Sequence, residues 1–289
     1  MSGTVLCLGA SGKIARHAAP VFKAAGWQVR MYDRRQGDMA AQARGADVIV
    51  NGLNPPNYHD WRRIVPAITR EVIAAAQASG ATVIVPGNVY VHGDTPGLWT
   101  EDTPHRPVSR KGRIREEMEQ AYRASGVRTI LLRAGDFISG QPGDTDVMGL
   151  IHLRQLARGR VVAPGNPDAL HAYGYLPDWA QAARLLADRR ATLPAFAEVN
   201  LGGANFTTRQ LCDSLSARLN RPLRLAAFPW TALRLLSPVW ELARELQEMR
   251  YLWQVSHGLV QDRLMGWVPD YRPTDLSKIM LAGLGAAFR

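Results

Sequence analysis

Short apolar runs alternate with helix-spaced apolar positions through the first half of the chain. The runs that read as buried strands are 4–8, 28–32, 48–51, 82–85 and 128–132. The segments 14–25, 61–79 and 113–124 repeat their apolar side chains at helical spacing. Strands that alternate with helices need crossover connections, which place the strands in a parallel sheet covered on both faces. We therefore expect an α/β fold, a doubly wound parallel sheet of Rossmann type.

The second half of the chain has a different texture. After about residue 140, helical patches are separated by Gly, Pro and Asp, and an amphipathic stripe runs from Val239 to Trp253. Core packing is the simplest interpretation of that stripe, and a membrane or partner surface is the alternative. We expect a Rossmann domain over residues 1–145, to which the chain returns at about 170–205. A smaller, mainly helical substrate-side region follows over 146–289.

Composition sets the class of protein without deciding its partner. The 289 residues are 46% hydrophobic and 21% charged, as in a folded globular protein. The formal net charge of +10 raises the question of a nucleic-acid partner. The basic residues are dispersed, however, and the sequence contains no recognisable nucleic-acid reading module. We expect no nucleic-acid partner, and one dense basic cluster, from Arg106 to Arg115, needs a separate explanation.

The start of the chain and its cysteines bear on location. The first residues lack a basic leader and a long apolar run, and no stretch approaches the roughly 20 apolar residues of a membrane span. Cys7 and Cys212 lie in apolar surroundings, which suits reduced thiols better than a disulfide. No His or Cys cluster has the spacing of a metal site. We expect a cytoplasmic protein with no membrane partner and no metal ion.

A glycine-rich turn is the strongest local motif. Gly9-Ala10-Ser11-Gly12-Lys13-Ile14-Ala15 follows the first strand and opens the first helix. A side chain on Gly9 or Gly12 would obstruct the approach of the backbone to a pyrophosphate, which the amides and dipole of a helix N-terminus attract. Asp33 ends the second strand, as acidic residues do in dinucleotide sites. The alternative interpretation is a plain tight turn.

Asp33 and the arginines after it bear on the choice of dinucleotide. A carboxylate at this position accepts hydrogen bonds from the adenosine ribose and repels a 2′-phosphate, which favours NAD. Arg34 and Arg35 follow at once and could bind that phosphate instead, which favours NADP. NAD is slightly favoured, and both cofactors stay open.

Further motifs follow the turn in a set order. They are Ala46–Gly52, Val83–Gly93, Glu101–Pro104, Leu132–Phe137, Tyr173–Ala180 and Met265–Pro269. With them the chain resembles the short-chain dehydrogenase/reductase superfamily, in its extended or atypical branch of NAD-dependent epimerase/dehydratase-like proteins. The resemblance implies NAD or NADP as cofactor. The contacts implied for it are Gly9, Ser11, Gly12, Lys13, Ile14, Asp33, Arg34, Gly52, Leu53, Asn88 and Arg115.

The chain departs from the family pattern in two places. Between Asp33 and Asp47 it is too short for the usual third strand, and the acid that contacts adenine in the family has no assigned counterpart, although Asp38 is a candidate. The family's catalytic Tyr and Lys, four residues apart, are replaced by Lys111 and Arg115, and Asn88 stands at the Ser or Thr position. The usual catalytic triad is therefore absent.

Two functions remain open. In the first, the protein is an oxidoreductase or epimerase for a small carbonyl, alcohol or sugar-like substrate, and the cations around Lys111 admit an anionic one. Neighbouring positive charge would favour the neutral amine, so that Lys111 acts as acid or base near neutral pH. Asn88, Tyr90 and Arg115 complete the candidate catalytic set, and His92 or Asp136 could orient the substrate.

The second function is binding without turnover. Proteins of the NmrA-like type, with degenerate triads, resemble this case and would act as NAD(P) sensors or scaffolds. Arg115 would then hold a ribose or phosphate, and Lys111 would be an ordinary solvated residue. A homodimer is compatible with either function.

Overall fold

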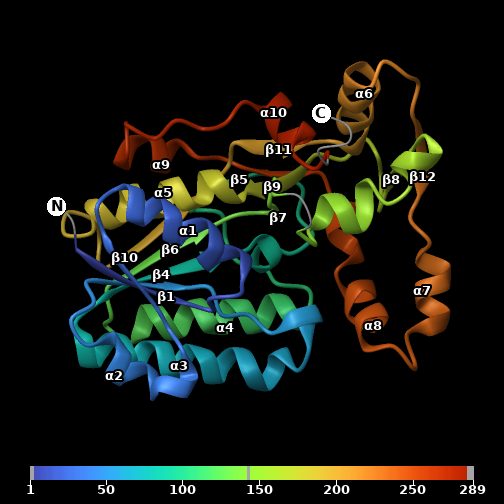
Figure 1. The fold of residues 1–289 in the computed structure, drawn as a ribbon. Coiled ribbons are helices and arrows are strands. Elements are labelled where there is room, and N and C mark those ends of the chain that lie inside the picture. Colours follow the sequence, from blue (N-terminus) through green and yellow to red (C-terminus); the bar gives the residue numbers. More distant parts are fainter. Residues whose placement is uncertain (1–2, 142–143, 285–289) are drawn as a thin grey trace.

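A six-stranded parallel sheet runs through the centre of the computed structural model, which describes residues 3–141 and 144–284 (Figure 1). Its strands are β1 (Thr4–Leu8), β2 (Gln28–Met31), β3 (Val48–Asn51), β4 (Thr82–Gly87), β6 (Thr129–Arg133) and β10 (Phe196–Asn200). They lie in the order β10-β6-β4-β3-β1-β2, and every neighbouring pair is parallel. From β1 the chain runs first to β2 on one side and then to β3 on the other. The predicted doubly wound sheet is confirmed.

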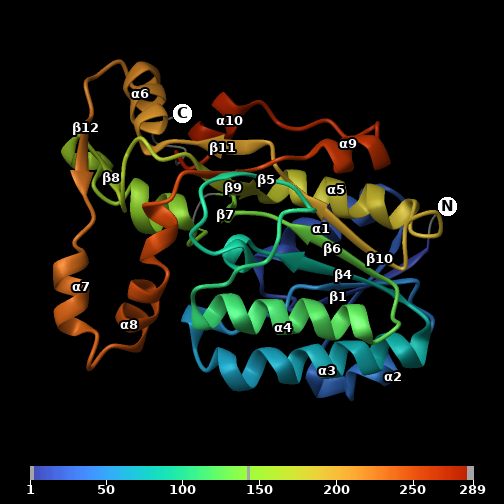
Figure 2. The ribbon, with the colours of Figure 1, turned by 180° about the vertical axis from the view of Figure 1, so that it is seen from behind.

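Helices cover both faces of this sheet. The helices α1 (Lys13–Ala24) and α5 (Leu176–Asp188) lie on one face (Figures 1 and 2). The opposite face carries α2 (Met39–Ala43), α3 (Trp61–Ser79) and α4 (Arg110–Ala124). Successive side chains of a strand point to opposite faces, so β1 contributes to both layers. Val5 and Cys7 pack in the core beneath α1, and Leu6 and Leu8 pack in the core beneath α3.

Local hydrogen bonds set the ends of two helices. The segment between β2 and β3 holds only the short turn η1 (Arg34–Gln36) and α2, as its length predicts. Asp38 caps α2, because its carboxylate accepts a hydrogen bond from the Ala41 amide at 2.6 Å. Helix α4 begins at Arg110 rather than at residue 113, because the Ser109 hydroxyl accepts from the Gly112 amide at 3.0 Å.

The chain after β6 contains strands as well as the predicted helices. The strands form three small sheets. One contains β7 (Asp136–Ile138), β9 (His171–Tyr175) and β11 (Ala204–Phe206). The second pairs β8 (Arg160–Ala163) with β12 (Arg224–Ala227), and the third pairs β5 (Gly97–Trp99), which precedes β6, with β13 (His257–Leu259). The helices are α6 (Thr208–Arg218), α7 (Trp230–Leu236), α8 (Glu241–Glu248), α9 (Asp262–Trp267) and α10 (Leu276–Leu281). Strands of three residues, such as β5, β7, β11 and β13, are too short to give a clear alternating pattern, so they escape a sequence-based prediction.

Strand β10 and the two cysteines lie in the interior of the protein. Strand β10 pairs with β6, so residues 196–200 belong to the central sheet. Cys7 and Cys212 are both buried and free, as expected. Within residues 3–141 and 144–284, no helix has the length and apolar content needed to cross a lipid bilayer.

Helices α7 and α8 form a hairpin that stands beside the sheet domain (Figures 1 and 2). A small core of its own joins it to β8, with Val162, Phe228, Leu233 and Ala243 buried together. One side of α8 reaches the short turn η2 (Pro56–Tyr58) that precedes α3. The hairpin thereby connects the C-terminal region to the carboxyl end of β3.

Candidate functional site

The carboxyl ends of β1 and β3 form the point where the strand order reverses, and ligands of open α/β sheets bind at such points. Gly9 has a φ of +76°, and its carbonyl accepts from the Gly12 amide at 2.7 Å, which closes the turn. A Cβ on Gly9 would lie 2.9 Å from the Gly52 carbonyl oxygen. A Cβ on Gly52 would lie 2.7 Å from the Leu8 carbonyl oxygen. Both glycines are needed for the close approach of two chain segments.

Helix α1 presents an open N-terminus at this turn. No side chain caps Gly12, and Ser11 is exposed. Such a helix end attracts anions through its amides and dipole. Lys13 donates from Nζ to the Thr145 carbonyl oxygen at 2.5 Å, and Arg16 pairs with Asp144 at 2.6 Å. The segment around residue 144 therefore lies beside the start of α1.

Asp33 is already engaged by a neighbour. Arg35 binds both of its carboxylate oxygens, at 3.0–3.2 Å, and the Arg35 amide donates to the same group at 3.0 Å. These hydrogen bonds lower the pKa of Asp33. The Arg35 side chain is 89% exposed, and Arg34 is exposed as well. The Asp33 carboxylate lies at the surface and is paired with the long, exposed side chain of Arg35. This arrangement does not decide between NAD and NADP.

The second part of the site lies beyond β4, where the chain passes into the turn η3 (Val89–His92). The Asn88 side chain accepts from the Tyr90 amide at 3.1 Å and so caps this turn. The Tyr90 hydroxyl lies 3.1 Å from the Tyr58 hydroxyl. The Lys111 ammonium lies 5.1 Å from the centre of the Tyr58 ring. The structure thus links Asn88, Tyr90 and Lys111 through the Tyr90 amide, the two hydroxyl groups and the Tyr58 ring.

Arg115 links this neighbourhood to β3. Its guanidinium donates to the Asn54 side-chain oxygen at 2.8 Å and lies 4.5 Å from the Trp61 ring centre. The Leu53 amide, one residue earlier, donates to the Asn51 side chain at 3.1 Å. Arg115 is therefore placed beside the predicted cofactor contacts Gly52 and Leu53.

The two tyrosines at the site are poor proton acceptors. Burial raises the pKa of Tyr58 to about 12 and raises the pKa of Tyr90 well above its ordinary value. Near neutral pH both phenols stay protonated. They can hold a ligand or a water by hydrogen bonds, but neither supplies a phenolate base.

Lys111 lies between two carboxylates of α8. Its side chain is 2% exposed, and Nζ forms a short ion pair with Glu245 and a 2.7 Å pair with Glu248. Burial opposes ionisation of Glu248, but the hydrogen bond and charge of Lys111 prevail and lower its pKa. Arg113 is exposed, and Arg115 faces Trp61. The immediate charges around Lys111 are negative, whereas the sequence suggested positive ones.

The acidic face of α8, formed by Glu241, Glu245 and Glu248, extends this contact. Glu241 pairs with His59 at 2.9 Å, and Glu248 also pairs with Arg110 at 3.0 Å. These acids follow at intervals of four and three residues, which places them on one side of a helix. That spacing is visible in the sequence, but the same segment also carries an apolar stripe, and the sequence does not show that the acids contact Lys111.

Two other candidates have different partners. Asp136 accepts from His171 Nε2 at 2.9 Å, so its carboxylate is directed into the histidine-rich contact with β9. His92 is 1% exposed and packs against Trp99, with ring centres 4.8 Å apart and the rings tilted by 37°. Burial, reinforced by the charge of Arg133, lowers the pKa of His92 to about 3. Neither residue contacts Lys111 through a hydrogen bond described by the structure.

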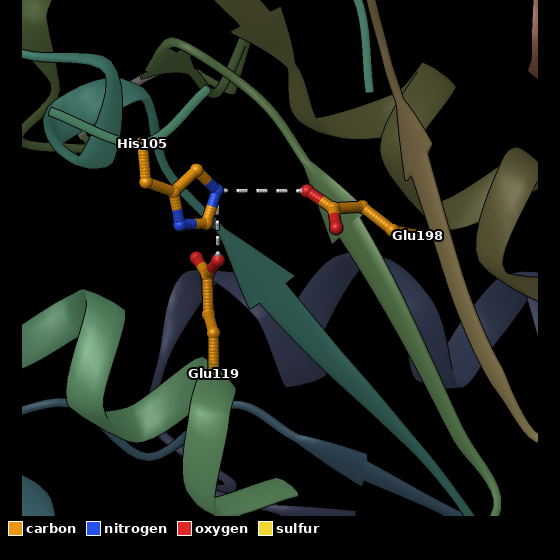
Figure 3. A group of neighbouring side chains, drawn as sticks. All are labelled: His105, Glu119 and Glu198. Atoms are coloured by element: carbon orange, nitrogen blue, oxygen red, sulfur yellow. Dashed lines mark ion pairs between the residues drawn. The ribbon is translucent and has the colours of Figure 1, made fainter. Parts of the chain in front are cut away.

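A buried charge network lies behind Asn88. Arg133 donates to Glu119 at 2.8 and 3.0 Å, to Glu198 at 2.5 Å and to the Asn88 carbonyl oxygen at 2.5 Å. His105 completes the group, with Nε2 at 3.7 Å from Glu119 and 4.0 Å from Glu198 (Figure 3). Although burial opposes its charge, the two glutamates raise the pKa of Arg133.

The spacing of His105, Glu119 and Glu198 alone would suit a metal ion. The guanidinium of Arg133, however, bonds to the same Glu119 and Glu198 oxygens that face His105. A divalent cation would have to share them with a fixed positive charge. The chemistry of this group is that of a structural ion-pair network that fixes the end of β6 beneath Asn88.

Comparison with known proteins agrees with this architecture. Solved structures of similar fold include MoeE5 in complex with UDP-glucose and NAD, at 16% identity over 97% of both chains and a TM-score of 0.74. UDP-glucuronic acid 4-epimerase from Bacillus cereus, in complex with UDP-glucuronic acid and NAD, matches at 13% identity over 97% of both chains with a TM-score of 0.75. RMD from Pseudomonas aeruginosa, complexed with NADPH, matches at 16% identity over 98% of both chains with a TM-score of 0.73.

No family model matches the sequence, and no curated protein does. At identities of 13–16% the structural matches establish the fold alone. The chain shares the fold of these NAD- and NADPH-bound proteins over nearly its whole length, which agrees with the fold implied by the resemblance of the sequence motifs.

Proposed function

We propose that this chain binds NAD or NADP as a protein of the epimerase/dehydratase type. The observation that carries the proposal is the glycine turn at the point of strand reversal, where Gly9 and Gly52 approach closely and α1 begins without a side-chain cap. The amides of Ser11, Lys13 and Ile14 would hold the pyrophosphate at this helix end. Proteins of the same fold that carry NAD or NADPH support the assignment.

The remaining contacts distribute along the same crevice. Asp33 or Arg34 would meet the adenosine ribose, while Gly52 and Leu53 would line the middle of the cofactor. Arg115 and Asn88 would meet its reactive half. When bound, the nicotinamide ring supplies or accepts a hydride. NAD is our first choice because Asp33 keeps its negative charge, which repels a 2′-phosphate. NADP is the alternative, because Arg35 could bind the 2′-phosphate if it left the Asp33 carboxylate.

The substrate we propose is small, anionic and sugar-like, with a carbonyl or alcohol at the reacting carbon. Neighbours solved with UDP-glucose and UDP-glucuronic acid support this class. In this enzymatic form Lys111 would hold or deliver the proton on the reacting oxygen, with Tyr90 and Asn88 orienting the substrate. Lys111 can do so only if a substrate, or a movement of α8, releases it from Glu245 and Glu248.

A specific observation favours a second candidate, dinucleotide binding without turnover. The residue at the family's catalytic tyrosine position is buried in an ion pair, and both nearby phenols have raised pKa values. A site of this kind can recognise the redox state of a cofactor without reacting. The protein would then act as an NAD(P) sensor or scaffold.

Titration of the full chain with NAD⁺, NADH, NADP⁺ and NADPH by calorimetry tests the shared proposal. We expect saturable binding of at least one dinucleotide, and absence of binding to all four would refute it. Incubation of the loaded protein with UDP-glucose and UDP-glucuronic acid separates the two candidates. Product supports the enzyme if Lys111→Met abolishes it, whereas bound cofactor with no product supports the sensor. Nicotinamide absorbance and mass detect net oxidation, reduction or loss of water, and chromatographic separation of sugar-nucleotide isomers detects an epimer, which has the mass of its substrate.

A further inference from the structure

Four large apolar side chains gather at the turn between α7 and α8. Leu235 is 75% exposed, Leu236 46%, Val239 87% and Trp240 46%. The described residues include four other exposed large hydrophobic side chains, and those are scattered along the chain from Met31 to Leu150. We call residues 235–240 the apolar tip. Isolated exposed side chains need no explanation, but a cluster on a protruding hairpin marks a contact surface.

The hairpin does not need the tip for its own packing. Its core is formed by Phe228, Leu233 and Ala243 against Val162, with Trp230 and Leu246 at the edge. Gln247 on α8 donates to the Trp230 carbonyl oxygen at 2.9 Å and ties the two helices together. The turn between α7 and α8 therefore projects from a supported scaffold (Figures 1 and 2). The apolar side chains of the tip are exposed and so are available to a partner.

The charges beside the tip are biased to positive. Arg234 precedes it on α7, is exposed and has no ion-pair partner within the described part of the chain. The acids of α8 are engaged with the sheet domain, Glu241 with His59 and Glu245 with Lys111. An unpaired cation thus accompanies the apolar tip, while Glu241 and Glu245 of α8 are paired.

We propose that the apolar tip docks on an anionic lipid surface. Leucine, valine and tryptophan enter the boundary between headgroups and acyl chains, where an indole ring is favoured, and arginines at the same level attract acidic headgroups. The net charge of +10 adds attraction over the whole molecule. The sequence led us to expect no membrane partner, and the tip changes that expectation to peripheral contact without a spanning helix.

A second copy of the chain fits the same surface less well. A symmetric contact would place Arg234 of each copy near the other, and like charges repel. A stable interface also needs roughly 800 Å² from each partner, more than four partly exposed side chains supply. A lipid surface requires neither shape complementarity nor so large an area.

Co-sedimentation of the full chain with vesicles tests the proposal. We expect binding to vesicles of phosphatidylcholine with phosphatidylglycerol, little binding to phosphatidylcholine alone, and weakening by salt because the headgroup attraction is screened. The variant Leu235→Ser/Val239→Ser/Trp240→Ser should lose affinity by about tenfold or more. Arg234→Gln should weaken binding to the anionic vesicles by a smaller factor.

Leu98→Ser is the matched control, since Leu98 is 63% exposed but lies in β5, away from the hairpin. It should bind vesicles like the unchanged protein, and circular dichroism should show that all variants are folded. Unchanged binding by the triple variant would overturn the proposal. The proposal would also be overturned if the protein did not bind vesicles and instead formed a concentration-dependent dimer that the triple variant abolishes. Neither result depends on dinucleotide binding, which the calorimetric titration measures separately.

Discussion

The two ends of the candidate site are built in different ways. The phosphate end consists of backbone from residues 9–15 and 51–53, where conformation follows from local sequence. The lysine end consists of side chains from four distant segments, around residues 54–61, 88–90, 111–115 and 241–248. The phosphate end depends on where glycine permits a turn. The lysine end depends on which side chains of these four segments come into contact in the fold.

The difference matters because the sequence shows which residues are charged but not which charged groups lie in contact. Arg110, Arg113 and Arg115 surround Lys111 in the chain, yet none of these guanidinium groups replaces the carboxylates in contact with its ammonium. Arg113, two positions from Lys111 on the helix, points in a different direction, while Arg115, one turn away, lies over Trp61 and Arg110 pairs with the same Glu248. The electrostatics of Lys111 are set by α8, which is more than a hundred residues away. Four predictions test this contrast, beginning with the largest effect.

Lys111→Met should reduce the free energy of unfolding by about 2–3 kcal/mol, because it removes the buried ammonium from Glu245 and Glu248 and leaves them only the more exposed Arg110 and Arg244 as partners. Dinucleotide affinity should change much less, since the phosphate end does not use Lys111. Chemical denaturation and calorimetric titration measure the two quantities. Arg113→Met, at an exposed neighbour on the same helix, is the control. A loss below about 1 kcal/mol would show that the buried pair contributes as little as a surface ion pair.

Acid should destabilise the histidine-rich side of the molecule. Burial lowers the pKa of His92 and of His257 to about 3, so in the fold both stay neutral while the unfolded chain takes up protons near pH 6.5. Stability is therefore lost as the pH falls from about 6.5 toward 3. The loss is at most about 1.4 kcal/mol per pH unit for each histidine.

Denaturation curves from pH 7 to pH 5 measure this slope. His92→Gln should make it shallower, whereas His59→Gln, at an exposed position, should not remove this buried-histidine contribution. A slope unaffected by His92→Gln would mean that His92 is protonated in the folded protein.

Gly9→Ala should weaken dinucleotide binding by about tenfold or more, which corresponds to about 1.4 kcal/mol. An alanine at a φ of +76° is strained, and its Cβ would press on the Gly52 carbonyl oxygen. Gly266→Ala is the matched control, because no atom lies within 4 Å of the Cβ it adds. Equal affinities for the two variants, measured by calorimetry, would contradict the role of the turn.

The smallest effect should come from Asp33→Asn. Removing the negative charge removes its repulsion of a 2′-phosphate and frees Arg35, so the ratio of NADPH to NADH affinity should rise by a few fold. Asp38→Asn, at the cap of α2, should leave that ratio unchanged. Parallel titrations with the two reduced dinucleotides measure it. A ratio that falls in Asp33→Asn would reverse our assignment of the adenosine end.

Much of the fold was accessible from the sequence. The helix over residues 61–79 and the strand over 48–51 have the predicted bounds, because long periodic segments and buried apolar runs carry strong signals. The short strands β5 and β13 were not predicted, since three residues give no period. The glutamates that hold Lys111 were missed because nothing local identifies their partner. Tyr58 and Trp61 were missed for the same reason, as their role arises from contact with Tyr90 and Arg115.

The sequence alone determined the alternation of strands and helices, the glycine turn and the position of its acidic partner Asp33. These features arise from sterics and periodicity within a few residues, so neighbouring positions suffice to specify them. Only the tertiary structure decided the environment of Lys111, the ion pairs of Arg133 and the exposure of the apolar tip. Each of these depends on segments brought together by packing, and at short range the energy of a charge or an apolar surface depends on what lies against it.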